Sequence, residues 1–123
     1  MPQYTAHHSG NTAPVTLQAS ATVTGGRLVL SSGASTCAPA TAAATTVVGV
    51  AAHDAASGDK VAVWPLPGVV HEVTGAGVVA AGDLLAAGAN GTVAAIGAGT
   101  FGQAIGKALA GAADGATVRF IGL

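Results

Sequence analysis

Short apolar runs punctuated by Gly and Asp recur along most of the chain, and this pattern strongly limits the fold. The runs are Val47–Ala52, Lys60–Trp64, Gly68–Val73, Leu84–Ala86, Thr92–Ile96 and Thr117–Ile121. Runs of this length between frequent turn residues are typical of strands in small all-β domains. The sequence therefore predicts a mainly-β fold, a small barrel or sandwich with short helical turns.

The N-terminal part of the chain divides into an arm and a strand. Residues 1–14 are polar, contain Pro2 and Pro14 and show no period, so we expect an extended arm. From Val15 to Val23 apolar and polar residues alternate, which predicts a half-buried strand. We expect residues 15–123 to form one β domain that follows this arm.

The next segments predict a turn, a strand and a long loop. Gly25-Gly26 indicates a turn, and Arg27–Leu30 begins a second strand. Ser31–Thr46 is rich in Ala and Thr and is predicted to be a loop. Further along, Asn90-Gly91 is the strongest hairpin signal in the chain.

An internal repeat connects the middle of the chain with its end. Val48–Val63 aligns without a gap with Ile105–Phe120. The identical pairs are Gly49/Gly106, Ala51/Ala108, Ala55/Ala112, Ala56/Ala113, Gly58/Gly115 and Val61/Val118. The alignment predicts one unit used twice: a strand, an Ala-rich turn or short helix, a Gly-Asp or Asp-Gly turn, and another strand.

Charged side chains are scarce, and this excludes several classes of function. Only 7% of the residues are charged, with four basic and five acidic side chains, whereas an average domain has about 25%. Nucleic-acid binding is not expected, because no basic stripe could neutralise phosphates. A surface with so few charges suggests that much of it is covered by copies of the chain or by a partner.

Membrane insertion and secretion are not expected. The uncharged stretches Leu28–Ala52 and Leu84–Gly106 are interrupted by Gly, Ser, Thr, Asn or Pro and lack flanking Lys/Arg clusters. The first residues have neither the basic nor the apolar region of a secretory signal. We therefore expect a protein made in a reducing cytoplasm.

The residue types that usually carry chemistry are present but not grouped. The lone Cys37 is interpreted as a buried, inert thiol. The four histidines lack HxH, HxxxH or HExxH spacing, so no metal site is predicted. Asp54, Asp59, Asp83 and Asp114 lie in turn-like contexts, where Asp bonds to local backbone. The sequence predicts no catalytic residue, metal or cofactor, and hence no enzyme.

A dinucleotide-binding enzyme fragment is one alternative. Gly97–Gly102 reads GxGxxG, lies after the strand-like Thr92–Ile96 and precedes the helix-like Gln103–Ala110. A βαβ unit also needs an acidic residue at the end of its second strand. Thr117–Ile121 would be that strand, and only Gly122-Leu123 follow it. The context therefore argues against this alternative.

The only segment that is both aromatic and proline-rich is Trp64-Pro65-Leu66-Pro67-Gly68. Its two prolines predict a rigid connection between strands. Trp64 could cap the core from the end of a barrel or anchor an interface between subunits, where Trp is enriched. The residues leave both roles open.

From Val47 to Leu123 the chain resembles the capsid cement, or head-decoration, proteins of tailed bacteriophages. The resemblance lies in VVGVAAHDAASGDKVAV, PGVVHEVTGAGVVAAGDLLAAGANGTV and FGQAIGKALAGAADGATVRFIGL, in that order and spacing. It implies a small β domain that assembles, often as trimers, on the outer face of an icosahedral shell. The family has no catalytic residues to transfer to this chain.

The resemblance implies the major capsid protein and further copies of this chain as partners. It places a homotrimer on the capsid outer surface of the virion, assembled in the host cytoplasm. The candidate capsid or subunit interface residues are Tyr4, His7, His8, Trp64, Pro65 and Pro67. We expect Met1–Pro14 to become ordered on binding, by pairing with a strand of the shell protein. A β module of a tail or adhesin assembly is a further alternative.

Overall fold

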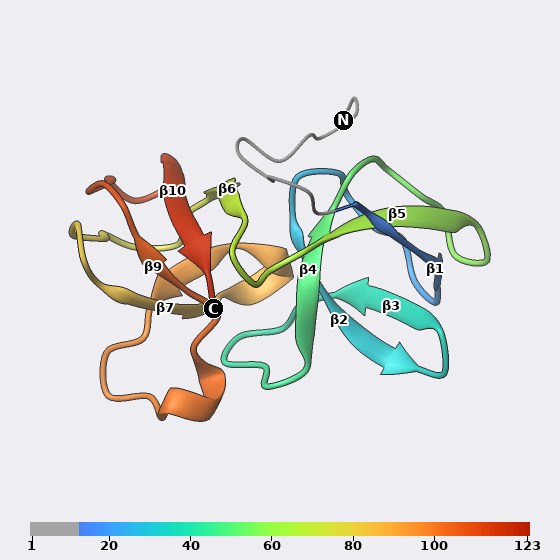
Figure 1. The fold of residues 1–123 in the computed structure, drawn as a ribbon, viewed down its shortest axis with the longest axis horizontal. Helices are drawn as coiled ribbons and strands as arrows, with labels where there is room; N and C mark the ends of the chain where they lie inside the picture. Colours follow the sequence, from blue (N-terminus) through green and yellow to red (C-terminus); the bar gives the residue numbers. More distant parts are fainter. Residues whose placement is uncertain (1–12) are drawn as a thin grey trace.

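Ten strands and two short 3-10 helices form the fold of residues 13–123, which are the residues that the computed structural model describes (Figure 1). The strands are β1 Val15–Ala19, β2 Leu28–Gly33, β3 Thr36–Pro39, β4 Val47–Ala51, β5 Lys60–Pro65, β6 Val70–Thr74, β7 Leu84–Ala87, β8 Val93–Ala95, β9 Gly106–Ala108 and β10 Thr117–Gly122. The helices are η1 Ala89–Gly91 and η2 Phe101–Gln103. The mainly-β prediction with short helical turns is confirmed.

The first five strands form a closed barrel in the order β1-β3-β2-β4-β5. Closure depends on β1, which pairs in parallel with β3 and antiparallel with β5. Successive side chains of a strand point to opposite faces, so one set of alternate residues fills the interior of the barrel. The buried interior residues are Ala19, Val23, Val29, Cys37, Ala51, Ala55, Val61 and Val63.

The second five strands form a sheet in the order β6-β10-β9-β7-β8. Its pairing repeats that of the barrel residue by residue. Val15↔Val63 in the barrel has its counterpart in His71↔Phe120. Val29↔Gly49 likewise corresponds to Leu85↔Gly106. The predicted internal repeat is therefore real, and it extends to all five strands of each unit.

The two units share one hydrophobic core. Leu28, Ala40 and Val50 from the barrel belong to the same buried cluster as Leu85 and Phe120 from the second sheet. Backbone hydrogen bonds also cross between the units, from the Ala43 N–H to the Ala87 carbonyl at 2.8 Å and from the Gly91 N–H to the Ala40 carbonyl at 2.9 Å. Burial of apolar surface on both sides of this contact stabilises their arrangement.

The structure confirms the predicted hairpin at Asn90-Gly91. It connects the antiparallel strands β7 and β8, and both residues have positive φ, 56° and 74°. Positive φ at both central positions defines the type I′ turn, which favours Asn-Gly.

Three sequence expectations are wrong in detail. Ser31–Thr46 is not a loop throughout, because β2 extends into it and it contains β3, which pairs with both β1 and β2. Gln103–Ala110 contains no α-helix but β9, held between β7 and β10. The alternating segment from Val15 ends as a strand at Ala19, and Val23 forms only an isolated bridge with Ala55. In the first two cases pairing with distant strands outweighs local preference, whereas β1 ends where its ladder with β3 and β5 ends.

Candidate functional site

The Trp64–Pro67 segment connects the barrel to the second sheet. Trp64 and Pro65 end β5 and are half-buried, while Pro67 is exposed in the connection. Trp64 pairs with Val50 of β4, which is buried in the shared core. The Pro65 carbonyl accepts a hydrogen bond of 2.9 Å from Nε2 of His71. The predicted connection between two strands is thus confirmed.

Leu66–Val69 closes one end of the second unit. Leu66 is 5% exposed and Val69 is fully buried. The Gly68 N–H donates to the Gly122 carbonyl at 3.1 Å, and the Gly122 N–H donates to the Val69 carbonyl at 2.9 Å. A side chain at Gly122 would overlap the Leu66 carbonyl oxygen. The segment Leu66–Val69, called here the plug, therefore covers this end of the second unit. It fits there only because residue 122 is a glycine.

Among residues 13–123, no segment covers the equivalent end of the barrel. It forms an apolar groove, called here the barrel mouth, lined by Val15, Leu17, Val48, Val63 and Pro65. Their counterparts in the second unit are all buried, and they are His71, Val73, Ile105, Phe120 and Gly122. In contrast, Val15 is 51% exposed in the barrel mouth.

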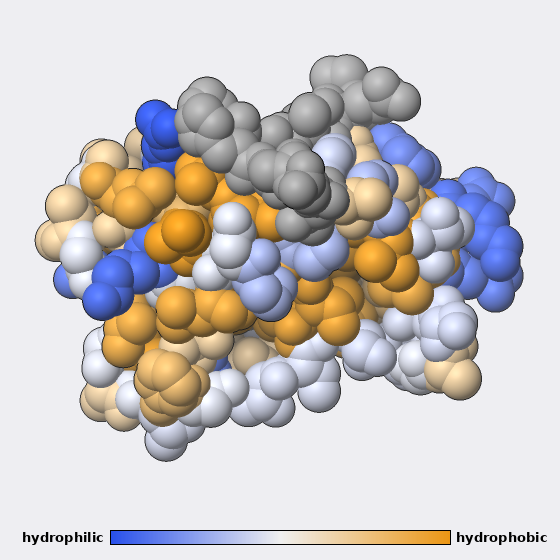
Figure 2. Space-filling view, in the orientation of Figure 1, coloured by the Kyte–Doolittle hydropathy of each residue, from blue (hydrophilic) through white to orange (hydrophobic). Residues whose placement is uncertain are grey.

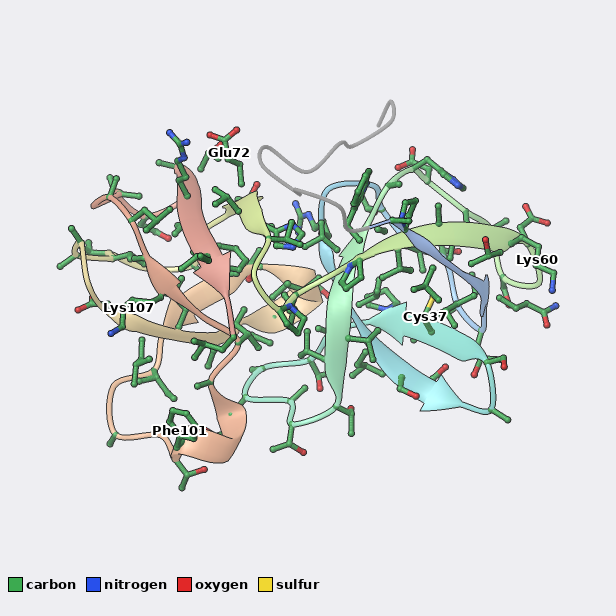
Figure 3. All side chains as sticks on the ribbon, in the orientation of Figure 1. Cys37, Lys60, Glu72, Phe101 and Lys107 are labelled. Atoms are coloured by element: carbon green, nitrogen blue, oxygen red, sulfur yellow. The ribbon has the colours of Figure 1, made fainter. Side chains whose placement is uncertain are left out.

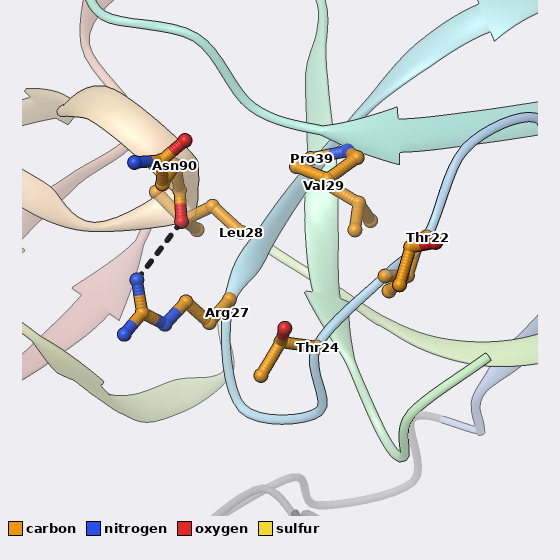
Figure 4. Close-up of a pocket in the computed structure, with 8 residues that line it drawn as sticks. Thr22, Thr24, Arg27, Leu28, Val29, Pro39 and Asn90 are labelled. Atoms are coloured by element: carbon orange, nitrogen blue, oxygen red, sulfur yellow. Dashed lines mark hydrogen bonds between the residues drawn. The ribbon is translucent and has the colours of Figure 1, made fainter. Parts of the chain in front are cut away.

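A second hollow lies where the barrel meets η1 (Figure 4). Its lining consists of Thr22, Val23, Thr24, Arg27, Leu28, Val29, Pro39 and Asn90. Arg27 donates from Nη1 to the Asn90 carbonyl at 3.1 Å, so its guanidinium helps to hold the two units together (Figure 4). Lined mostly by Thr and aliphatic side chains, this hollow offers no acid–base pair for chemistry.

The GxGxxG segment forms a turn with an exposed aromatic side chain. Phe101 begins η2 and is 75% exposed (Figure 3). The segment leads into β9, an antiparallel strand, rather than into a helix. A dinucleotide site needs a βαβ unit with the pyrophosphate at a helix N-terminus. Residues 13–123 contain no such unit.

The residues that could carry chemistry are held in structural roles. Cys37 is buried in the barrel, and burial raises the pKa of its thiol, as expected of an inert cysteine. The carboxylates of Asp83 and Asp114 accept backbone hydrogen bonds from Ala80 and Gly77 at 2.9 and 2.7 Å. Over residues 13–123 no three His, Cys, Asp or Glu side chains gather to hold a metal ion.

His71 is the one buried polar side chain in the described core. Its ring lies 5.6 Å from that of Phe120, centroid to centroid. Burial lowers the pKa of His71, and the hydrogen bond with the Pro65 carbonyl partly opposes this shift. The sequence did not single out His71 for such a role, because burial at this position depends on the plug formed by Leu66.

Several of the charged side chains lie at the edges of the molecule. Lys60, Glu72 and Lys107 lie at three different edges (Figure 3), and hydrophobic residues spread across both units between them (Figure 2). None of the helices in the described part of the chain has the length and hydrophobicity to cross a membrane.

The candidate interface residues are only partly placed by the structure. Trp64, Pro65 and Pro67 lie together at the end of β5 and in the connection that follows. Tyr4, His7 and His8 lie outside the described residues, as does most of the predicted arm. The barrel mouth and Phe101 were not predicted. The mouth could have been suspected from the repeat, because bulky Leu66 and Val69 precede β6 whereas Gly10 and Ala13 precede β1.

Comparison with known proteins identifies a matching family and a similar solved structure. The family model described as "Phage cement protein" matches residues 7–123. Among solved structures, the chain is similar to the crystal structure of the head fiber gp8.5 N base in bacteriophage phi29, with a TM-score of 0.66 and 23% identity. That similarity covers 91% of this chain and 94% of the other. The curated proteins contain no match.

The family match takes in both five-stranded units and the connection between them. It supports a role as a structural component associated with the phage capsid. The chain therefore belongs to the phage cement protein family.

Proposed function

We propose that this protein binds the outer surface of an assembled icosahedral phage head as a homotrimer and stabilises the shell through contacts with the major capsid protein. It is assembled in the host cytoplasm and remains on the virion. The observation that carries the proposal is the family match over residues 7–123. A described surface with few charges and an open apolar groove supports it.

The proposed shell interface combines the arm with the Trp64–Pro67 segment. Pro14 and Val15 lead the arm into β1, and β1 pairs with β5, which ends at Trp64 and Pro65. The arm, which contains Tyr4, His7 and His8, therefore continues in sequence into the strand that pairs with the one carrying Trp64. Because both prolines restrict the backbone, the segment loses little conformational freedom when it binds.

The mechanism requires no chemical step. Each contact between one copy and the shell is modest, but a trimer that engages several shell subunits gains affinity through effective concentration. A bound trimer stabilises the shell because its contacts exist only in the assembled state, so dissociation of the shell must break them. The protein is in this way a clamp between shell subunits and not an enzyme.

The test removes residues 1–14 and measures binding to purified heads by co-sedimentation. We expect the truncated protein to keep its β-sheet circular dichroism spectrum and to lose head binding. Trp64→Ala in the full chain is the companion variant, and Lys107→Ala, exposed on β9, is the control. Heads saturated by the truncated protein with unchanged affinity would contradict the role of the arm.

A parallel assay separates head binding from the alternatives. Wild-type protein is mixed with purified heads and, separately, with purified tails. Association with tails and not with heads would indicate a tail or adhesin module and would contradict the proposed function. Heads with bound protein are expected to withstand a higher temperature before they release DNA than heads without it.

A further inference from the structure

We propose that Asn90 is a latent modification site: contacts with the barrel block its spontaneous deamidation while the two units are packed together, and the reaction proceeds when they separate. The inference goes beyond the proposed function and does not depend on binding to the head. It rests on the contacts that Asn90 and Gly91 make with the barrel, and on the chemistry of this pair of residues.

The reaction needs only water and groups of the chain itself. The Gly91 amide nitrogen gives up its proton to solvent base and attacks Cγ of Asn90. A bond forms between these two atoms, and the Nδ2 group takes a proton from solvent and leaves as ammonia. Water then opens the resulting succinimide ring, at Cγ to give aspartate or at the backbone carbonyl to give isoaspartate. Glycine favours the first step, because no side chain crowds the attacking nitrogen.

The fold requires both residues for the shape of this turn. Asn90 and Gly91 have φ of 56° and 74°, a region that Asn tolerates and Gly adopts freely. Gly91 is also buried, and a Cβ there would lie 2.6 Å from the Leu28 carbonyl oxygen. The equivalent hairpin of the barrel, between β2 and β3, has the exposed Ala34-Ser35 in this place. The labile pair thus occurs in the hairpin that packs against the other unit.

Two hydrogen bonds with the barrel oppose the reaction (Figure 4). The Gly91 N–H donates to the Ala40 carbonyl at 2.9 Å, which occupies the proton that must be removed. Arg27 Nη1 donates to the Asn90 carbonyl at 3.1 Å and so helps to fix the peptide plane between Asn90 and Gly91. With ψ of 37° at Asn90, this plane directs the Gly91 nitrogen away from the Asn90 side chain. The reaction therefore requires both bonds to break and the plane to rotate.

Access of solvent does not provide the protection. Asn90 is exposed, so water and base can reach its side chain. What holds the reaction back is the position of the Gly91 nitrogen, and both hydrogen-bond partners that fix it, Ala40 and Arg27, belong to the barrel. Isoaspartate at position 90 would lengthen the backbone by one carbon atom. The turn would then no longer fit against Leu28, so the modified units could not repack in the same way.

Mass spectrometry of the peptide that contains residue 90 measures the reaction. Wild-type protein is incubated in mildly alkaline buffer, folded in one sample and unfolded in guanidinium chloride in the other, and conversion of the Asn90 amide to a carboxyl group is followed with time. We expect the folded sample to react more slowly by about tenfold or more, because packed parts of a native structure open rarely. Equal rates in the two samples overturn the proposal.

Arg27→Ala tests whether the barrel supplies the protection. The variant loses the hydrogen bond to Asn90 but keeps the Cβ atom beside Gly91. In the folded state its deamidation rate should rise by about 2- to 10-fold, the effect of losing one hydrogen bond. Lys107→Ala, which removes an exposed cation from β9, is the matched control and should react at the wild-type rate. Unfolded, all three chains should react alike.

Hydrogen exchange of the Gly91 amide gives a second measurement on the same opening. In the wild type this amide should exchange slowly, because it is buried and bonded to Ala40. In Arg27→Ala its exchange and the deamidation of Asn90 should accelerate by the same factor. Rapid exchange of the Gly91 amide in the wild type, or an unchanged deamidation rate in folded Arg27→Ala, overturns the proposal.

Discussion

His71 and Phe120 face each other across β6 and β10, and they hold the positions that Val15 and Val63 hold in the barrel. One pair is completely buried, whereas the other includes a valine that is 51% exposed. Within residues 13–123, the same strand pairing therefore produces a covered end in one unit and an uncovered groove in the other. The difference comes from Leu66 and the segment around it, which cover only the second unit.

Burial of His71 makes stability depend on pH. The folded protein keeps the imidazole neutral, because burial lowers the pKa of His71, while the unfolded chain takes up a proton near pH 6.5. Below that pH the unfolded state binds more protons, so the free energy of unfolding falls as pH falls towards the folded-state pKa. The slope from this one site is at most about 1.4 kcal/mol per pH unit.

Urea unfolding between pH 5 and 7.5 measures this slope. In His71→Leu the slope should be reduced, although the variant loses the hydrogen bond with Pro65 at all pH values. Val78→Ala, at an exposed residue without a titratable group, is the control that should keep the wild-type slope. An unchanged slope in His71→Leu would show that other groups cause the pH dependence.

Gly49 and Gly106 occupy equivalent positions in the two units, and neither position has room for a side chain. A side chain at Gly49 would overlap the Trp64 carbonyl oxygen, and one at Gly106 would lie 2.5 Å from Phe120 Cδ2. Gly49→Ala should therefore lower the free energy of unfolding by about 1–3 kcal/mol or more, the usual cost of overpacking. Chemical denaturation measures it. Gly102→Ala is the control, because its nearest neighbour would be Thr100 Oγ1 at 3.9 Å.

The amount of structure visible in the sequence differs between strands. β4, β5 and β10 were predicted closely, because their apolar runs lie between clear turn residues. β3 was missed, since Thr36–Pro39 has small and polar side chains without alternation. β9 was expected to be helical because its neighbourhood is rich in Ala, yet pairing with β7 and β10 makes it a strand.

Closure of the barrel could not be predicted from the pattern. It requires the parallel pairing of Gln18 with Thr36, which joins distant parts of the chain and leaves no local trace. The candidate site shows the same limit. Trp64 and Pro67 attracted attention by residue type, whereas exposure of Val15 and Phe101 depends on what the folded chain leaves uncovered.

The shared core leads us to propose that residues 15–123 unfold as one domain. Leu66 lies in the core cluster that both units contribute to. Leu66→Ala should lower the free energy of unfolding by about 2–5 kcal/mol and leave a single transition in calorimetry. Leu109→Ala, at a residue that is 48% exposed, should change stability by less than about 0.5 kcal/mol. Two separate transitions in the wild type would contradict the single domain.

Binding to the phage head should depend only weakly on salt. The proposed interface, residues 1–14 with Trp64–Pro67, contains no Lys, Arg, Asp or Glu side chain. Salt screens interactions between charges and affects apolar contacts much less, so little of the binding free energy is open to screening. Raising NaCl from 50 to 500 mM should change the dissociation constant by less than about fivefold, the contribution of one exposed ion pair. Co-sedimentation across this range measures it, with wild-type stability recorded at each concentration. A loss of affinity by orders of magnitude would show that charged side chains elsewhere on the molecule, such as Lys60 or Lys107, carry the attachment.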